Sequence, residues 1–317
     1  MLGATTAGII GLPFLALGAV AVDLIRRRPK LPTLRVALFL LQYAVNDSAE
    51  VLLAPLLWLM AGFGQRRSSD ASQRRYRRVQ AWSVAVLARR AEQLLGLRID
   101  IDSASLSALS PGPVITLCRH VNLVDASLPA LLHQRLGQHP RGVIMAELLA
   151  DPGFDLIYPH TGSVFIPRDD GQQARAILAR LVHDLTIEDA IVIFPEGRLF
   201  RPERLQRSLT RLAETDPERA ERLAGLRHGL PPRPGGVTTL LDLAPDADVV
   251  VIAHAGLERF ASFRALTQAV PLTEPVHVAA WRFPRTDIPT GPRDRIDWLD
   301  NRWLQVDEWV EQHMRRS

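Results

Sequence analysis

The sequence predicts an α/β fold, in which a sheet is flanked by helices and preceded by an N-terminal helical segment that anchors the chain to a membrane. Short apolar runs alternate with helical patterns from residue 99 onward, as in sheets that helices cover. An apolar fraction of 47% over 317 residues permits a full hydrophobic core. Residues 2–25 are almost uninterruptedly apolar, which indicates the membrane anchor.

This first apolar stretch is predicted to be a membrane helix. Its length of roughly 20 residues matches the hydrocarbon thickness of a bilayer. The basic residues 26–30 follow it and place its C-terminal end in the cytosol. A signal peptide would carry its charges before the apolar core rather than after it, so we favour the membrane helix.

A second apolar region, residues 34–63, is interrupted by the polar residues 46–50 and followed by basic residues between 66 and 78. As one helix it would be about 45 Å long, too long for an upright span, with two carboxylates near its middle. A single crossing would also put the second basic cluster outside. We therefore predict a re-entrant or interfacial helical hairpin that returns to the cytosolic side. The alternative is a pair of core helices packed on the domain.

These segments divide the chain into three parts. Residues 1–64 form the predicted membrane segment, with one membrane helix plus the hairpin. Residues 65–75 are polar and Ser-rich, which is typical of a linker, and residues 76–317 form the main domain. The charge pattern predicts that this domain lies on the cytosolic face of the plasma (inner) membrane.

Hydrophobic periodicity predicts the elements of the main domain. An amphipathic helix is expected at residues 76–97. Strands are expected at residues 114–117, 142–145, 163–166, 191–194, 249–253 and 276–281. Helices are expected at residues 123–135, 172–186, 211–226, 236–243 and 293–313.

The composition favours some partners over others. The formal charge is +4 and is carried by arginine, because Lys30 is the only lysine. The guanidinium fork suits phosphate and anionic lipid headgroups. Nucleic acid is disfavoured as a partner, because the arginines are interspersed with acidic residues and form no stripe with aromatic residues.

Cofactors and thiol chemistry are not indicated. The single cysteine, Cys118, cannot form an intramolecular disulfide, and its place at the end of an apolar strand predicts a buried, inert thiol. The sequence has no zinc-type cluster and no Gly-rich nucleotide loop, so we expect no metal and no cofactor. Asp169 and Asp170 are interpreted as charges at a helix N-terminus rather than as metal ligands.

His120 and Asp125 are the most informative pair of residues. They follow the predicted strand at 114–117 and precede a helix, so both side chains can meet on the turn at the rim of a sheet. A carboxylate that accepts one ring N–H fixes the tautomer and leaves the other nitrogen free to accept a proton. The pair therefore predicts a general base with its orienting partner.

Two further segments, residues 161–168 and 190–200, are apolar runs that each end in a charged turn. The order His-x4-Asp, Gly-x-x-Phe-Ile-x-Arg and Phe-Pro-Glu-Gly resembles the phospholipid/glycerol acyltransferase superfamily, best known through lysophosphatidic acid acyltransferases. The resemblance covers about residues 76–317, and residues 226–236 resemble the Leu-Pro-Arg-x-x-Gly segment of many members. It implies a mixed, largely parallel sheet and makes residues 76–317 an acyltransferase domain.

The resemblance also implies residue roles. His120 would remove the proton of an acceptor hydroxyl, Asp125 would hold the imidazole, and Arg168 would bind the acceptor phosphate. The implied substrate-binding set is Gly162, Phe165, Arg168, Glu196, Gly197 and Arg198.

The chain departs from the family pattern at three places. Arg119 stands where the family usually has Asn, and Arg198 stands where it usually has Thr. Either Arg198 or Arg201 would replace the arginine missing from the third motif. A Val-Pro-rich strand of the family appears as residues 249–255, where His254 is interpreted as a core histidine, although its place at a strand end also fits a pocket residue.

The implied reaction moves a fatty acyl group from acyl-CoA or acyl-carrier protein, as co-substrate, to the free hydroxyl of a lysophospholipid in phospholipid biosynthesis. The first candidate acceptor is 1-acylglycerol-3-phosphate, a membrane lipid. The alternatives are another lysolipid or polar lipid, a lipid hydrolase or thioesterase, and a non-catalytic lipid-binding protein at a membrane surface. A serine hydrolase is disfavoured, because the sequence has no Gly-x-Ser-x-Gly motif.

Overall fold

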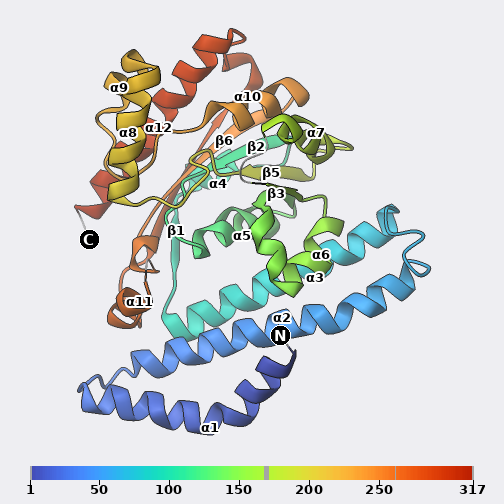
Figure 1. Cartoon of the computed structure of the whole chain (residues 1–317), viewed down its shortest axis with the longest axis vertical. Helices are drawn as coiled ribbons and strands as arrows, with labels where there is room; N and C mark the ends of the chain where they lie inside the picture. The colour runs from blue at the N-terminus through green and yellow to red at the C-terminus, as the bar shows by residue number, and fades with distance from the viewer. Residues whose placement is uncertain (1, 168–170, 261, 316–317) are drawn as a thin grey trace. The chain divides into compact units, whose positions relative to one another are not determined.

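The computed structural model describes residues 2–167, 171–260 and 262–315 (Figure 1). The chain forms two compact units. The first unit comprises residues 1–98, 145–165 and 259–275, and the second comprises residues 99–144, 166–258 and 276–317.

A seven-stranded mixed sheet has the strand order β1-β7-β6-β2-β5-β3-β4 (Figure 1). Strand β7 is antiparallel to β6, whereas β1–β7, β6–β2, β2–β5 and β5–β3 pair in parallel. The predicted mixed, largely parallel α/β fold is confirmed. The strands are β1 (Ile99–Ile101), β2 (Val114–Cys118), β3 (His139–Met145), β4 (Val164–Ile166), β5 (Asp189–Ile193), β6 (Asp248–Ala255) and β7 (Val276–Phe283).

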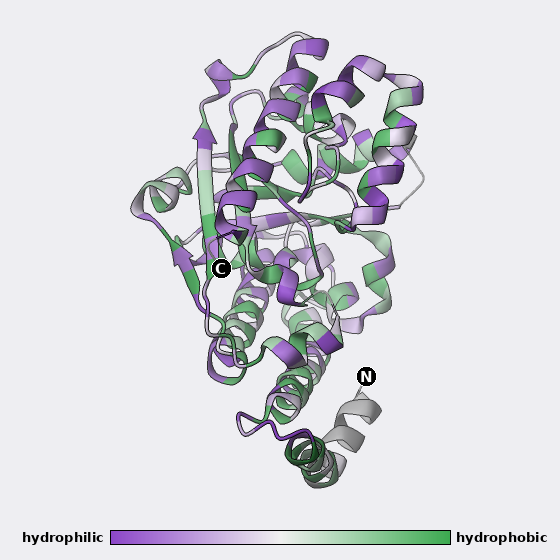
Figure 2. Cartoon of the chain, turned by 90° about the vertical axis from the view of Figure 1, so that its left-hand side faces the viewer, coloured by the Kyte–Doolittle hydropathy of each residue, from purple (hydrophilic) through white to green (hydrophobic). Residues whose placement is uncertain are grey.

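The central strands are buried along their whole length and are mostly apolar, because helices cover both faces of the sheet. Every residue of β2 and β5 is buried, and Figure 2 shows hydrophobic residues (green) running along the strands. The register pairs Leu117 of β2 with Ile193 of β5. The segments that follow these two strands therefore leave the sheet at the same edge, where α/β proteins place their ligand sites.

Helices of the second unit pack on both sides of this sheet. In Figure 1, α7, α10 and α12 lie on one side and α5 lies on the other. The α-helices of this unit are α4 (Ser103–Ala108), α5 (Ser127–Arg135), α7 (Gly171–Val182), α8 (Pro202–Thr215), α9 (Pro217–Leu223), α10 (Pro234–Leu243) and α12 (Pro292–Met314). Short 3-10 helices cover Val124–Ala126, Leu257–Phe260 and Arg285–Asp287.

The single helix predicted at residues 211–226 is wrong, because two helices occupy this region. Asp216 ends α8, and its side chain accepts the N–H of Arg219 at 3.1 Å to cap α9, which begins at Pro217. Proline at a first helical position has no N–H to lose there, and Asp is a favoured N-cap. The Asp216-Pro217 pair thus starts a new helix, although the apolar pattern continues through it.

The first unit is helical. Its α-helices are α1 (Leu2–Ile25), α2 (Pro32–Met60), α3 (Asp70–Arg90), α6 (Pro152–Ile157) and α11 (Phe263–Ala269). A π-helical turn at Ala91–Leu95 extends α3, and 3-10 helices cover Ala146–Ala150 and Tyr158–His160. Helix α3 begins at residue 70, inside the linker predicted at residues 65–75. Ser69 caps it, its hydroxyl accepting the N–H of Ser72.

The helical hairpin predicted within residues 34–63 is absent, because α2 continues through the polar residues 46–50. These residues are tolerated because their side chains face other helices of the same unit. Asn46 donates to the hydroxyl and carbonyl oxygens of Ser83 on α3, at 2.8 and 3.1 Å. Asp47 accepts the N–H of Gly153 on α6 at 2.9 Å. The polar residues therefore mark a packing face of one helix and not a break.

A short non-helical turn, residues 26–31, instead joins α1 to α2. Both carboxylate oxygens of the buried Asp23 accept the N–H of Thr33, and one of them accepts the N–H of Leu34 as well. These contacts satisfy N–H groups that the first turn of α2 leaves without a partner. Leu31 precedes the helix with a positive φ of 50°, which lets the chain reverse direction over a few residues.

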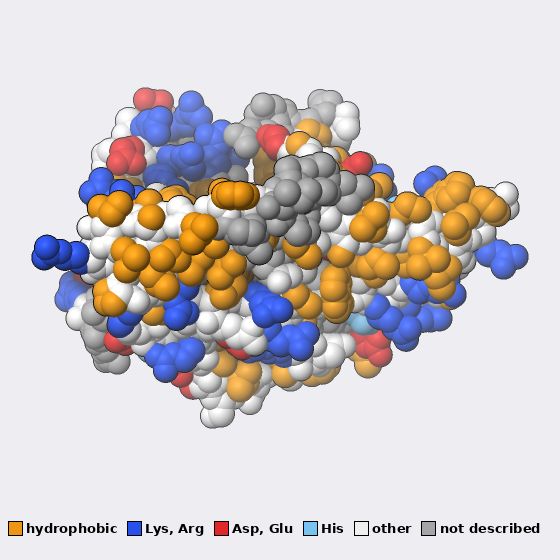
Figure 3. Space-filling model, turned by 90° about the horizontal axis from the view of Figure 1, so that it is seen from below, with side chains coloured by type: hydrophobic (Ala, Val, Ile, Leu, Met, Phe, Trp, Pro, Cys, Tyr) orange, Lys and Arg blue, Asp and Glu red, His pale blue; other side chains and the backbone are white. Residues whose placement is uncertain are grey.

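Large apolar side chains lie exposed along α1 and α2. Figure 3 shows them as a band over these two helices with arginines beside it. They include Phe14, Leu15, Leu17, Leu24, Ile25, Leu40, Leu52, Leu56, Trp58, Leu59, Met60 and Phe63. Among the described residues, α2 is the one helix long and apolar enough to cross a membrane by length and composition. We call these exposed side chains the apolar face of the first unit.

Candidate active site

His120 and Asp125 lie together on the loop that follows β2, as their spacing predicts. The Nδ1 atom of His120 is 2.6 Å from Oδ1 of Asp125. The Asp125 side chain is 0% exposed, whereas the imidazole retains 17% of its surface. The carboxylate is thus shielded from water while the ring remains accessible from one side.

Backbone N–H groups hold Asp125 in place. Its Oδ2 atom accepts the N–H groups of Val121 and Asn122. Asn122 in turn accepts the N–H of Val124 at 2.7 Å and of Asp125 at 3.0 Å, which forms a turn typical of Asn. Sequence reasoning missed Asn122, although an Asn just before a helix start is a signal for such a turn. These N–H groups fix Asp125 and are not available to a substrate oxyanion.

The hydrogen bond to Asp125 determines what His120 can do. Because a carboxylate is an acceptor, Nδ1 carries the proton and Nε2 of the neutral ring presents its lone pair. In the described part of the chain, Nε2 has no hydrogen-bond partner. The ring also packs against Phe194, with ring centroids 4.4 Å apart. The geometry is that of an oriented base with an open acceptor nitrogen.

Glu196 supports this loop from inside the protein. Its side chain is buried, with Oε1 accepting the N–H of His120 at 3.2 Å and Oε2 accepting the N–H of Leu230 at 3.0 Å. Glu196 was predicted to bind substrate, but both of its oxygens hold backbone groups. We therefore assign it to positioning His120.

The turn after Glu196 requires glycine. Gly197 has φ of +64°, and a Cβ atom there would lie 3.2 Å from Cδ of Arg233. Arg198 is exposed, whereas Arg201 donates to the carbonyl oxygen of Val121 at 3.1 Å. Of the two arginines that were candidates for the missing motif arginine, Arg201 is the one that contacts the His120 loop.

Arg119 is fully buried where the sequence pattern would have Asn. Its guanidinium donates to the carbonyl oxygens of His228 and His254 at 2.8 and 2.9 Å and pairs with Glu258. Burial alone would raise the pKa of Glu258, but the neighbouring arginine leaves it lowered. Arg119 therefore links His228, His254 and Glu258 next to the loop that carries His120.

Residues 101–253 match the family described as Acyltransferase. The chain contains an acyltransferase-family domain. The solved structures include a match to the 1-acyl-sn-glycerophosphate (LPA) acyltransferase, PlsC, from Thermotoga maritima, with a TM-score of 0.50 and 13% identity over 86% of this chain and 98% of that one. At this identity the likeness shows a common fold. Comparison with curated proteins gave no match.

His254, on β6, is a core histidine. Its side chain is buried, and its Nε2 atom lies 3.0 Å from the carbonyl oxygen of Arg119. Burial lowers its pKa, so the ring is neutral and donates this hydrogen bond. Cys118 is buried as well, and burial raises the pKa of its thiol well above the usual value. An inert thiol is what the sequence predicts for it.

The remaining predicted site residues lie in other parts of the chain. Gly162 and Phe165 belong to the first compact unit, where Gly162 has φ of +92° in the turn before β4 and Phe165 is half-buried within that strand. Arg168, Asp169 and Asp170 lie outside the described residues.

Glu196 gives a testable pH dependence of stability. Burial raises its pKa from 4.5 to about 8, against the lowering effect of its N–H donors and of Arg119. A raised pKa means that the folded protein holds the Glu196 proton more tightly than the unfolded chain does. The resulting stabilisation of the fold is fully present below pH 4.5 and is lost as the pH rises through about 8. We expect Glu196→Gln to remove this part of the slope when the free energy of unfolding is measured by denaturant titration at several pH values. The exposed Glu214→Gln variant is the control. An unchanged slope in Glu196→Gln would contradict the assignment.

Proposed function

We propose that this acyltransferase moves a fatty acyl group from acyl-CoA or acyl-carrier protein to the free hydroxyl of a lysophospholipid, with 1-acylglycerol-3-phosphate as acceptor. The observation that carries the proposal is the His120–Asp125 pair, 2.6 Å apart, whose Nε2 atom is open inside the matched acyltransferase region. A base with an open acceptor nitrogen can take the proton that an acceptor hydroxyl must lose.

The chemistry needs no covalent acyl-enzyme. Nε2 of His120 takes the hydroxyl proton while the acceptor oxygen attacks the thioester carbonyl, and Asp125 stabilises the imidazolium that forms. The tetrahedral intermediate then collapses, the C–S bond breaks, and the imidazolium returns its proton to the thiolate. The products are the new ester and a free thiol.

The acceptor assignment rests on Arg168 at the end of the second motif. A guanidinium binds a phosphomonoester through two parallel hydrogen bonds, which a neutral acceptor cannot form. We expect Arg168→Ala to raise the apparent Michaelis constant for lysophosphatidate far more than that for the thioester, in assays of purified protein in detergent with a panel of lysophospholipids. Arg175→Ala, an exposed arginine on α7, is the matched control. Equal effects on phosphorylated and unphosphorylated acceptors would remove the role assigned to Arg168.

For the membrane segment, we propose that α2 lies along the cytosolic surface of the plasma membrane. The apolar residues Leu52, Leu56 and Leu59 are exposed, whereas Asn46 and Asp47 are buried on the opposite, packed side. A helix with one apolar and one buried polar face suits an interface better than the hydrocarbon centre. The basic residues before and after α2 then reach the same layer of headgroups.

Cysteine accessibility tests this topology. Single cysteines at Lys30 and Ser69, in a Cys118→Ser background, are expected to be shielded from a membrane-impermeant thiol reagent in intact cells. Both should be labelled after permeabilisation, because both ends of α2 face the cytosol. Labelling of the Ser69 position from outside would show that α2 crosses the bilayer.

A further inference from the structure

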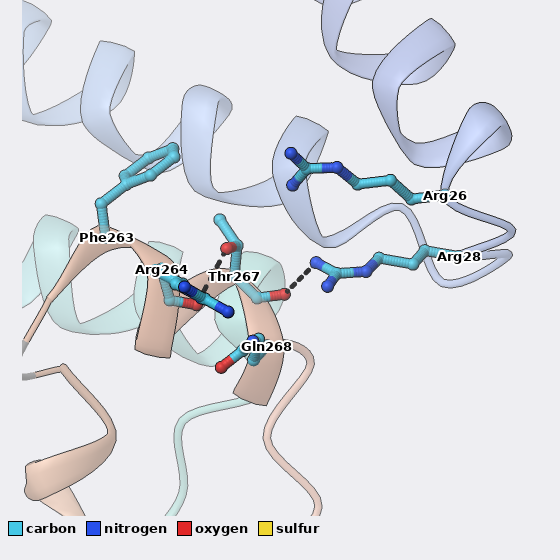
Figure 4. Close-up of a pocket in the computed structure, with 6 residues that line it drawn as sticks. All are labelled: Arg26, Arg28, Phe263, Arg264, Thr267 and Gln268. Carbon is cyan, nitrogen blue, oxygen red and sulfur yellow. Dashed lines mark hydrogen bonds between the residues drawn. The ribbon is translucent and has the colours of Figure 1, made fainter.

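We propose that a basic pocket of the first unit binds the phosphate group of an anionic membrane phospholipid. The pocket has a volume of about 460 Å³ and is lined by Arg26, Arg28, Phe263, Arg264, Thr267 and Gln268 (Figure 4). None of these residues belongs to the proposed catalytic machinery. The inference is therefore independent of the reaction proposed above.

Two elements bring the arginines together. Arg26 and Arg28 come from the turn between α1 and α2, and Arg264 comes from α11. Figure 4 shows the side chains of Arg26 and Arg28 extending toward α11, while that of Arg264 extends in the opposite direction from α11. Guanidinium groups that approach one space from two sides can bind the oxygens of a single phosphate group.

The charge of this pocket is uncompensated. Among the residues that the structure describes, no carboxylate lines it. Within the described ranges, neither Arg26 nor Arg264 has an ion-pair partner, whereas Arg28 uses one donor on the carbonyl oxygen of Thr267 at 3.2 Å. Like charges held near one another repel, so an arrangement of this kind is stabilised when an anion binds.

The two segments that line the pocket, the α1–α2 turn and α11, are fixed by contacts within the protein. The buried Asp23 caps α2 immediately after the turn that carries Arg26 and Arg28. Helix α11 is fixed by a hydrophobic cluster in which Val270 and Leu266 pack with Val36 of α2. A preformed pocket binds its ligand without first ordering the side chains that support it.

The apolar surroundings favour a lipid over a free anion. Ile25, immediately before Arg26, is 81% exposed, and Phe263, beside Arg264, is 58% exposed. Ile25 belongs to the apolar face of the first unit, which Figure 3 shows with arginines beside it. A phospholipid matches both features, because its phosphate reaches the arginines while its acyl chains cover exposed apolar side chains.

Native mass spectrometry of the full chain in detergent tests the site. Arg26→Gln/Arg264→Gln removes the two arginines that have no ion-pair partner in the described structure, so the fold should be retained. We expect the affinity for phosphatidylglycerol to fall about 25-fold, from a factor of about 5 for each arginine, with binding of phosphatidylcholine unchanged. Circular dichroism and acyl transfer in detergent should match those of the unmodified protein.

A control variant distinguishes binding in the pocket from general electrostatic attraction between the basic protein surface and anionic lipid. Arg89→Gln/Arg90→Gln makes the same change in charge at the exposed end of α3 in the same unit. It should retain nearly full affinity for phosphatidylglycerol. Equal losses in both double variants, or no loss in the pocket variant, would overturn the proposal. Displacement of phosphatidylglycerol by inorganic phosphate at equal concentration would show a free-anion site and overturn the lipid assignment.

Discussion

Replacement of His120 by alanine is expected to lower the rate of acyl transfer by about 10²–10⁴, the usual contribution of a positioned general base. The acceptor hydroxyl then has no group to take its proton as the oxygen attacks the thioester. His120→Ala also removes the hydrogen-bond donor to Oδ1 of the buried Asp125, so we expect the free energy of unfolding to fall by about 1–3 kcal/mol, far less than would explain the loss of rate if the protein stays folded. The measurement is the turnover of purified protein with saturating thioester and lysophospholipid.

The control for this change is another histidine with an acidic neighbour. His183 pairs with Asp184 at an exposed site of the same unit, so His183→Ala should leave turnover unchanged. If His120→Ala retained near-native turnover with every thioester and acceptor tested, the proposed mechanism would be wrong.

Asp125→Asn is expected to cause a loss of up to about 10⁴-fold, because it changes the tautomer of His120. The Oδ2 atom of Asp125 accepts two backbone N–H groups, and only the oxygen of an Asn side chain can replace it. The amide NH₂ group would then face Nδ1 of His120. A donor at this position favours the ring with its proton on Nε2, which leaves no base for the substrate.

Nitrogen NMR of the labelled imidazole reports this change directly. The unmodified protein should show the Nδ1–H tautomer and Asp125→Asn the Nε2–H tautomer, with unfolding by denaturant showing whether the fold persists. The exposed Asp184→Asn variant should alter neither turnover nor tautomer. A native tautomer together with a large loss of turnover in Asp125→Asn would contradict this account of Asp125.

The sequence predicts the parts of this protein that local patterns determine. Apolar runs located six of the seven strands, and the missed β1 has only three residues. The spacing of His120 and Asp125 on a strand-to-helix turn predicts their contact, because both residues lie on one short loop. The order of three different motifs predicted the acyltransferase family, which residues 101–253 match.

Features that depend on distant partners escaped prediction. The polar residues within α2 resembled a helix break because Ser83 and Gly153, which bind Asn46 and Asp47, lie far along the chain. The contacts of Glu196 with the backbone N–H groups of His120 and Leu230 were not predicted, because no side-chain pattern reveals a backbone partner. Local propensity yields to tertiary packing at such positions.

The proposed reaction requires that His120 activates the hydroxyl of a lysolipid and not water. The direct measurement incubates purified protein with an acyl thioester labelled in its acyl group and with lysophosphatidate, and follows labelled phospholipid, labelled free fatty acid and released thiol. We predict that label enters the phospholipid with one thiol released for each ester formed, and that His120→Ala slows this transfer by about 10²–10⁴. Label found in free fatty acid alone would identify a hydrolase, and intact thioester would identify a binding protein; either result would contradict the acyltransferase reaction proposed for this chain.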